Sequence, residues 1–162
     1  MLRRFLAGIA LVAAGSVVGI TLHLAIVTGD TMFAGKRPDY LGVKDGKLPR
    51  PKRTPNNVSS QADASDAEHF ITPIRFNGTT SDAMAAVRKA VESMERATVV
   101  RHEGNYLYAE FKSKLLGFVD DVEFTHDSTA GVIHVRSASR LGRRDFGVNR
   151  ARVEALRSRL EK

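Results

Sequence analysis

The sequence predicts a small α+β domain, residues 69–162, behind an N-terminal membrane anchor. Two patterns predict the domain: consecutive short segments with alternating apolar and polar residues, and two segments with apolar residues at helical spacing. Short strands joined by turns form an antiparallel sheet, and helices with one apolar face must cover the same side of it. A long apolar run near the N-terminus predicts the anchor.

The composition is that of a basic globular protein. The 162 residues include 25 Lys and Arg against 18 Asp and Glu, which gives a formal net charge of +7. Hydrophobic residues make up 43% and charged residues 27%, so the chain can bury a core and is not disordered as a whole. There is no Cys, which excludes disulfides, thiolate metal sites and a cysteine nucleophile.

The anchor is the run 5–28, which lacks Asp, Glu, Lys and Arg and follows Arg3 and Arg4. A helix of this length spans about 36 Å, enough to cross a hydrocarbon core of about 30 Å. A cleavable signal peptide is the alternative, but its apolar region is usually about 7–15 residues long. We expect residues 1–28 to be an uncleaved single-pass anchor. A short polar head before the span favours a periplasmic or extracytoplasmic location for the rest of the chain.

Gly15 and Gly19 form a small-residue notch within this run. Such a notch lets two membrane helices approach closely, which predicts a dimer through these two glycines. Because the same spacing is common by chance in membrane helices, a helix without a partner is the alternative.

Residues 29–68 have the composition of a linker. They hold four of the five Pro residues, several Gly and polar runs, and their seven basic and six acidic residues nearly cancel. This is typical of a solvated tether. Because the basic residues crowd into 36–53, the alternative is that this stretch lies against an anionic bilayer surface.

The domain begins with a strand and a helix. Residues 71–76 are expected to form a short strand, in which Pro73 favours an edge position. A helix is expected to start near Asp82, capped by Thr80 or Ser81. Its apolar stripe consists of Met84, Val87, Val91 and Met94.

Four strands follow without another helix, at 98–102, 106–112, 118–125 and 131–138, and a final helix is expected from about 148 to 160. The predicted order is therefore β-α-β-β-β-β-α, with about five antiparallel strands and both helices on one face. The alternation places these polar side chains on the outer face, away from the helices: Tyr106, Tyr108, Glu110, Asp121, Glu123, His134 and Arg136.

Asp120 falls among apolar residues on the inner face of the strand 118–125. A buried carboxylate is costly unless it is paired, and its natural partners are the Arg residues near the end of the next strand. One interpretation is a structural Asp–Arg anchor. The other is an enzymatic site, a hydrolase or transferase in which Asp120 or Asp121 acts as general base and Arg140 stabilises charge.

The C-terminal part is rich in Arg. Residues 134–162 contain nine basic residues, eight of them Arg, and three acidic residues. Arg binds carboxylate or phosphate through two parallel hydrogen bonds, and Ser hydroxyls beside a helix N-terminus can hold an anionic group. The predicted ligand-binding residues are Arg136, Ser137, Ser139, Arg140, Asp120, Asp121 and Asn149. The alternative is a solvated basic helix face, with Asp145 or Asn149 capping the helix.

Several function classes lack their signals. His102, His126 and His134 have no metal-ligand spacing, and the sequence has no P-loop, dinucleotide fingerprint or Gly-x-Ser-x-Gly elbow. We therefore expect no metal and no cofactor. Nucleic acid is a poor partner for an anchored domain in which Tyr106 and Tyr108 would be the only stacking platform.

Three segments carry a resemblance to a known family. Residues 116–124 (LGFVDDVEF), 135–142 (VRSASRLG) and 145–154 (DFGVNRARVE) resemble the family of unknown function numbered 1499, over about 41–160. Members are often bacterial envelope or plastid proteins with N-terminal membrane or export segments, which agrees with an anchor and implies no activity. The motif with which the family begins usually carries two Cys, where this chain has Asn57 and Pro51.

The sequence favours a membrane-anchored, non-enzymatic domain that binds an anionic or amphipathic ligand, such as a lipid, or an envelope protein. The enzyme described above is one alternative. A structural subunit of a membrane complex is another, and its sign would be an exposed apolar patch around Tyr106, Tyr108 and Val132.

Overall fold

The computed structural model of the protein describes residues 33–161. The predicted anchor, with the span 5–28 and the glycines Gly15 and Gly19, lies outside the described residues. Within 33–161, no helix is both long and apolar enough to span a bilayer.

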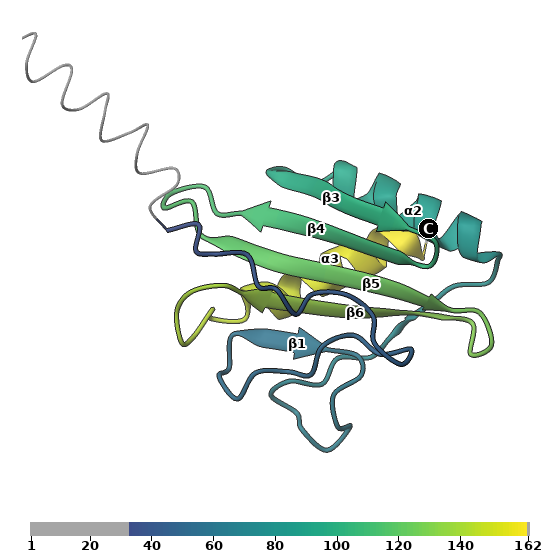
Figure 1. The fold of residues 1–162 in the computed structure, drawn as a ribbon, viewed down its shortest axis with the longest axis horizontal. Helices are drawn as coiled ribbons and strands as arrows, with labels where there is room; N and C mark the ends of the chain where they lie inside the picture. The colour runs from purple at the N-terminus through teal and green to yellow at the C-terminus, as the bar shows by residue number, and fades with distance from the viewer. Residues whose placement is uncertain (1–32, 162) are drawn as a thin grey trace, which may run out of the picture.

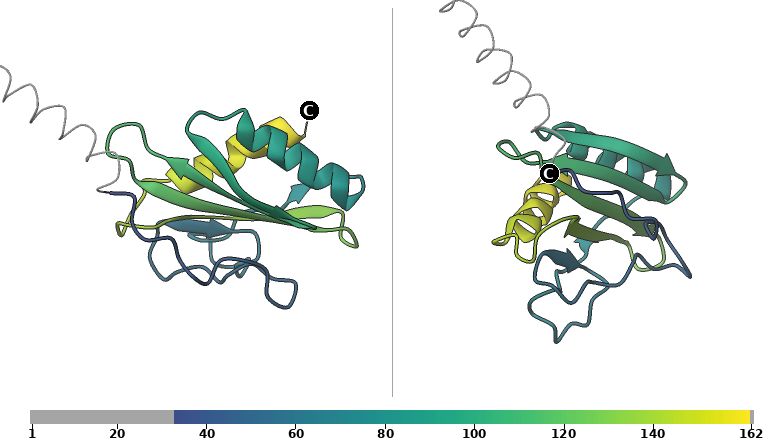
Figure 2. Two further views of the ribbon diagram at one scale, coloured as in Figure 1. Left: turned by 45° about the horizontal axis from the view of Figure 1, so that its top comes forward. Right: turned by 60° about the vertical axis from the view of Figure 1, so that its left-hand side comes forward.

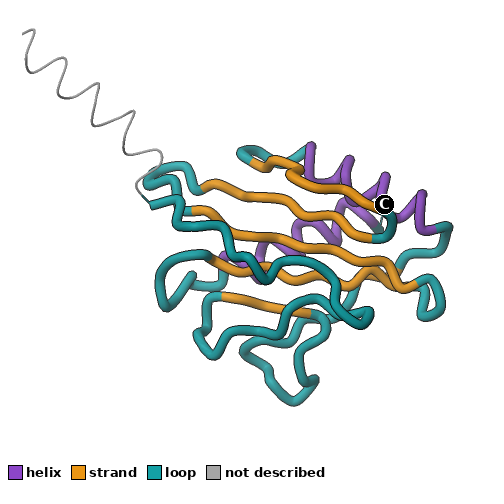
Figure 3. Tube along the Cα trace, in the orientation of Figure 1, coloured by secondary structure: helices purple, strands orange, loops and turns teal. Residues whose placement is uncertain are grey.

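The described chain is an α+β domain with six strands and two helices (Figures 1 and 3). In chain order these are β1 (Asn57–Ser59), β2 (Ile74–Arg75), α2 (Thr80–Glu92), β3 (Ala97–Glu103), β4 (Tyr106–Lys112), β5 (Val119–Asp127), β6 (Val132–Ser139) and α3 (Val148–Leu160). The strands form one antiparallel sheet in the order β1-β6-β5-β4-β3, and β2 pairs with the part of β6 that β1 leaves free.

Both helices cover the same face of the sheet, as predicted (Figure 2). The apolar stripes of α2 and α3 pack with the inward side chains of β4, β5 and β6 in one core. Its most deeply buried members include Met84, Val87, Leu107, Val122, Phe124, Ile133, Val135, Val153 and Leu156. Burial of these side chains is the main stabilising contribution to the domain.

The predicted cap of α2 is wrong by one residue. The N-cap is Thr79, whose hydroxyl accepts a hydrogen bond from the Asp82 backbone N–H at 3.1 Å. The Asp82 carboxylate in turn accepts from the Thr79 backbone N–H at 3.2 Å. This reciprocal capping box needs a spacing of three residues, which Thr80 and Ser81 do not have relative to Asp82.

β1 is the sixth strand, which the sequence analysis does not predict. It lies within 29–68, the segment with a linker-like composition, and pairs with residues 136–138 of β6. Its three residues are too few to show an alternating pattern. Its apolar residue Val58 is buried in the core, so β1 contributes packing as well as backbone hydrogen bonds.

The outer face of the sheet is covered by irregular chain. Residues 33–53, which we call the cover segment, run across β4, β5 and β6 on the side opposite the helices (Figures 1 and 2). Leu48 of this segment packs with Tyr106 and Tyr108, which are only 5% and 3% exposed. The chain itself therefore covers these tyrosines, and they do not form the exposed apolar patch expected of a structural subunit.

Val58→Ala should lower the free energy of unfolding by about 2 kcal/mol, because it removes buried methyl groups that close the core. The measurement is urea denaturation of the detergent-solubilised full chain, followed by far-ultraviolet circular dichroism. Val43→Ala, at a 37% exposed site in the cover segment, is the control and should change the value by less than about 0.5 kcal/mol. Equal small effects would show that β1 adds nothing to the core.

Candidate functional site

Strand alternation divides the predicted ligand-binding residues between the two faces of the sheet. On the helix side lie Asp120, Ser137, Ser139 and Asn149, and on the side of the cover segment lie Asp121, Arg136 and Arg140. Six of the seven are buried, and the seventh, Arg140, has a side chain that is only 6% exposed. The structure therefore does not join them into one open site.

On the helix side, Asn149 ties three elements together. Its amide donates to the backbone oxygen of Asn56, just before β1, at 3.0 Å and to the Ser139 hydroxyl of β6 at 2.9 Å. Its side-chain oxygen accepts from the Ser137 hydroxyl at 2.5 Å. Asn149 is fully buried, so these bonds satisfy groups that water cannot reach, which is a structural role.

Asp120 and the start of α3 complete this cluster. The partner of Asp120 is Arg152 of α3, at 2.5 Å, and not an Arg of β6 as predicted. The N-cap of α3 is Gly147. The Asp145 carboxylate, two residues earlier, accepts from the Gly147 and Asn149 backbone N–H groups at 3.1 and 2.9 Å. The chain's own carboxylate thus occupies the helix N-terminus that was expected to hold an anion.

On the outer face, Glu123 and Arg136 form an ion pair with 0% and 1% side-chain exposure. Arg136 Nη1 donates to Glu123 Oε2 at 2.9 Å, while the Tyr106 hydroxyl and the Gly42 backbone N–H donate to Oε1 at 2.9 and 2.8 Å. Burial raises the pKa of Glu123 even with Arg136 beside it, and burial also raises the pKa of Tyr106. The tyrosine therefore remains a hydrogen-bond donor.

A second ion-pair group lies beside the first. Arg140 binds the carboxylates of Asp121, at 2.8 Å, and Glu110. The Tyr108 hydroxyl lies 2.6 Å from the Asp121 carboxylate and 2.8 Å from that of Glu110, so its single proton can be donated to either, and Arg37 of the cover segment donates to Glu110 at 2.8 Å. Burial by itself lowers the pKa of Arg140, but the hydrogen bonds to its two carboxylates outweigh it and raise the pKa above the ordinary value.

These contacts bear on the enzymatic interpretation of Asp120 and Asp121. A general base must reach a substrate proton across open space. Both carboxylates are instead buried and ion-paired, Asp120 with Arg152 and Asp121 with Arg140. This arrangement is that of structural anchors between elements.

An open groove lies above the outer face, and the cover segment forms it. The chain runs out to a two-residue turn at Asp45 and Gly46, closed by two backbone hydrogen bonds between Lys44 and Lys47 at 2.9 and 3.0 Å, and then returns. Both turn residues have positive φ, as a type I′ turn requires. The groove between the two arms encloses about 1360 Å³. Its lining consists of Tyr40, Gly42, Lys44, Asp45, Lys47, Leu48, Pro49, Arg50, Pro51, Lys52 and Gln61.

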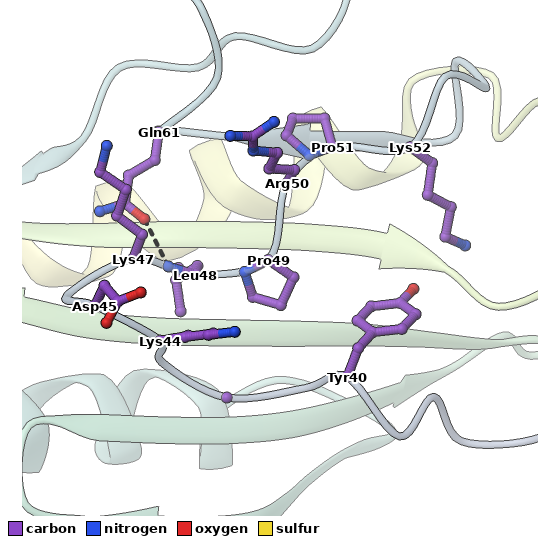
Figure 4. Close-up of a pocket in the computed structure, with 11 residues that line it drawn as sticks. Tyr40, Lys44, Asp45, Lys47, Leu48, Pro49, Arg50, Pro51, Lys52 and Gln61 are labelled. Atoms are coloured by element: carbon purple, nitrogen blue, oxygen red, sulfur yellow. Dashed lines mark hydrogen bonds between the residues drawn. The ribbon is translucent and has the colours of Figure 1, made fainter.

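The lining combines cations with apolar surface. Four side chains are basic and one is acidic, and Leu48 and two prolines provide the apolar part. Figure 4 shows Tyr40 and Lys52 at the same end of the groove, where the Lys52 amine donates to the Ser139 backbone oxygen of β6 at 2.7 Å. Burial lowers the pKa of Lys52, with a further contribution from the positive charge of Arg136.

Arg136 lies directly beneath this groove. Its guanidinium carbon is 5.6 Å from the centre of the Tyr40 ring, which lines the groove and is 50% exposed. Arg136 Nε and Nη2 are buried and have no hydrogen-bond partner among residues 33–161. Buried polar atoms without a partner are rare and costly, so the hydrogen bonding of this arginine is incomplete although its charge is paired with Glu123.

Sequence reasoning missed the groove because residues 36–53 show neither helical nor strand periodicity. The local sign was Asp45-Gly46, a strong signal for a tight turn, next to the apolar Leu48. The sequence does predict Arg136 as a ligand-binding residue. Its missing hydrogen-bond partners could not be predicted, because they depend on which residues cover it in the fold. In the described part of the chain, no group of three or more His, Asp and Glu side chains is placed to hold a metal ion.

Comparison with known proteins gives a family but no activity. The model of the family described as "Protein of unknown function (DUF1499)" matches residues 47–160, which is most of the folded part of the chain. No curated protein matches the chain.

The Glu110 contacts predict a pH dependence of stability. Burial alone would raise the pKa of Glu110, but hydrogen bonds from Tyr108, Arg140 and Arg37 outweigh it and hold the pKa below its ordinary value. A carboxylate with a depressed folded-state pKa stabilises the fold above its unfolded pKa of about 4.3, and this contribution is lost as the pH falls through the folded value.

Glu110→Gln should therefore flatten the fall in unfolding free energy between neutral pH and about pH 3. The expected difference at neutral pH is about 1 kcal/mol or less, because the side chain is partly exposed. Urea denaturation across this pH range measures it. Glu95→Gln, which removes a carboxylate outside this network, is the control, and identical slopes for the two variants would contradict the prediction.

Proposed function

The chain belongs to the family Protein of unknown function (DUF1499), and from this premise we propose that its folded domain is a non-enzymatic binding module. Residues 5–28 hold it at a membrane, with the domain on the periplasmic or extracytoplasmic side. The module takes an anionic, amphipathic ligand in the groove of the cover segment. Of the predicted ligand-binding residues, Arg136 takes part in binding, and the other six hold the fold together.

This proposal rests on the two buried N–H groups of Arg136 that have no hydrogen-bond partner among residues 33–161. Nη1 is engaged by Glu123, which leaves Nε and Nη2 on one edge of the guanidinium plane. Two donors on one edge match the two oxygens of a carboxylate or phosphate. An anionic group that reached this edge would supply the acceptors that these two N–H groups lack.

The half-exposed Tyr40 ring gives a route to that edge. The ring lies over the guanidinium and is held at the rim of the groove, so a change of its rotamer opens Arg136 to the groove. Lys44, Lys47 and Arg50 are exposed along the path and attract a negative charge.

The apolar lining favours an amphipathic ligand over a bare anion. The partly exposed Pro49 and Pro51 offer apolar contact within a groove large enough for a small-molecule ligand. A membrane-held domain also has amphipathic molecules close to it at high local concentration. The groove therefore suits a ligand whose anionic head group contacts the basic side chains and whose apolar chain lies along the prolines.

Dodecyl phosphate, an anionic amphiphile, is the probe for the groove. We expect the full chain, solubilised in a neutral detergent, to bind it in isothermal titration calorimetry. Lys47→Gln/Arg50→Gln should weaken this binding about 30-fold, at roughly 1 kcal/mol for each exposed cation. Both positions are exposed, so the double variant should keep its fold.

The control variant is Lys89→Gln/Arg159→Gln, which removes the same charge from the two helices on the opposite face. It should bind the probe like the wild-type chain. Equal weakening in both variants would show that the groove has no special role, and the absence of binding to the wild-type chain would contradict the proposal.

A further inference from the structure

One end of the domain brings together three segments that are distant in sequence. They are the β4–β5 loop 113–118, the β6–α3 loop 140–147 and the first described residue, Phe33, and we call them the loop end (Figures 1 and 2). The Phe33 and Phe118 rings lie 5.1 Å apart. A side chain at Gly35 would come within 3.0 Å of Leu141, so the start of the cover segment is fixed against both loops.

The loop end exposes large apolar side chains. Phe146 is 95% exposed in the β6–α3 loop, and Leu115 is 90% exposed in the β4–β5 loop. Leu116 and Leu141 in the same loops are 50% and 40% exposed, and Val148, the first residue of α3, is 50% exposed directly after the second loop. Single exposed apolar residues are ordinary, but a group of them gathered at one end of a domain marks an interaction surface.

Basic residues accompany these apolar tips. Lys114, Arg143 and Arg144 are exposed in the same two loops. The acidic residue of these loops, Asp145, is engaged by the start of α3. The surface thus combines protruding apolar side chains with positive charge, which is the pattern of a protein surface that rests on an anionic bilayer.

The tether places this surface next to a membrane. Phe33 follows the end of the apolar run at Thr28 by five residues. A fully extended chain of that length reaches at most about 18 Å. Phe33 belongs to the loop end. The connection of five residues therefore keeps the loop end closer to the predicted span than the opposite end of the domain.

We propose that the loop end docks on the bilayer, with Leu115 and Phe146 inserted at the boundary between head groups and acyl chains. Lys114, Arg143 and Arg144 lie among anionic head groups. This inference rests on the membrane tether of the proposed function, and it does not depend on a ligand in the groove.

Tryptophan fluorescence can test this docking, because the natural chain contains no Trp. The full chain carrying Phe146→Trp or Leu115→Trp is reconstituted into vesicles of phosphatidylcholine and phosphatidylglycerol with brominated acyl chains. Ala130→Trp, in the β5–β6 turn at the opposite end of the sheet, is the matched control. We expect the brominated lipid to quench most of the Trp emission of the Phe146→Trp and Leu115→Trp variants and little of the Trp emission of the Ala130→Trp control.

The head-group contribution is tested in the same vesicles. Arg143→Gln/Arg144→Gln, added to Phe146→Trp, should shift the docking equilibrium about fivefold per residue away from the bilayer and so reduce quenching. Carbonate extraction of the same vesicles reports on the tether independently.

The outcomes separate docking from tethering. If the chain resists carbonate but Phe146→Trp is quenched no more than Ala130→Trp, the docking proposal fails and the tether stands. If carbonate releases the chain, both fail. Quenching that is confined to the loop-end variants and weakened by loss of the two arginines supports the docking.

Discussion

The buried pair of Glu123 and Arg136 is the constraint on which the outer half of the structure depends. Burying a charged pair on a sheet face is costly, and each donor or acceptor that the surrounding chain satisfies lowers that cost. The cover segment supplies the Gly42 N–H to Glu123 and lays Tyr40 over Arg136. The same segment encloses the groove, so the burial of this pair and the shape of the proposed binding site have one cause.

Charged pairs also specify the register of β5. The neighbours Asp120 and Asp121 point to opposite faces, and each meets its own arginine there, Arg152 from α3 and Arg140 beyond β6. A slip of one residue would move one aspartate into the place of the other, so that one of the two arginines would lose its carboxylate, and it would turn Val122 and Phe124 away from the core. An apolar strand of the same length would have no such penalty against misalignment. The ion pairs and the apolar alternation of β5 therefore specify the same register.

The sequence predicted those elements of the structure whose residues show a helical or alternating period. The strands near 106–112 and 118–125 and the two helices showed clear alternation or helical spacing, and the structure contains them. β1 and the cover segment have no period, because their positions are set by contacts with β6 and with tyrosines far along the chain. Arg136 was identified as a site candidate from residue type alone. Its partners and its burial depend on chain folded from elsewhere, so they could not be predicted.

Stability alone does not account for Arg136. A buried ion pair can often be exchanged for apolar residues of similar volume without loss of stability. Among residues 33–161, two of the three nitrogens of Arg136 have no hydrogen-bond partner, although both carboxylate oxygens of Glu123 accept hydrogen bonds. A structural pair would need no such asymmetry. In the proposed function, an acceptor from outside the chain completes the arginine and enters through the basic groove above Tyr40.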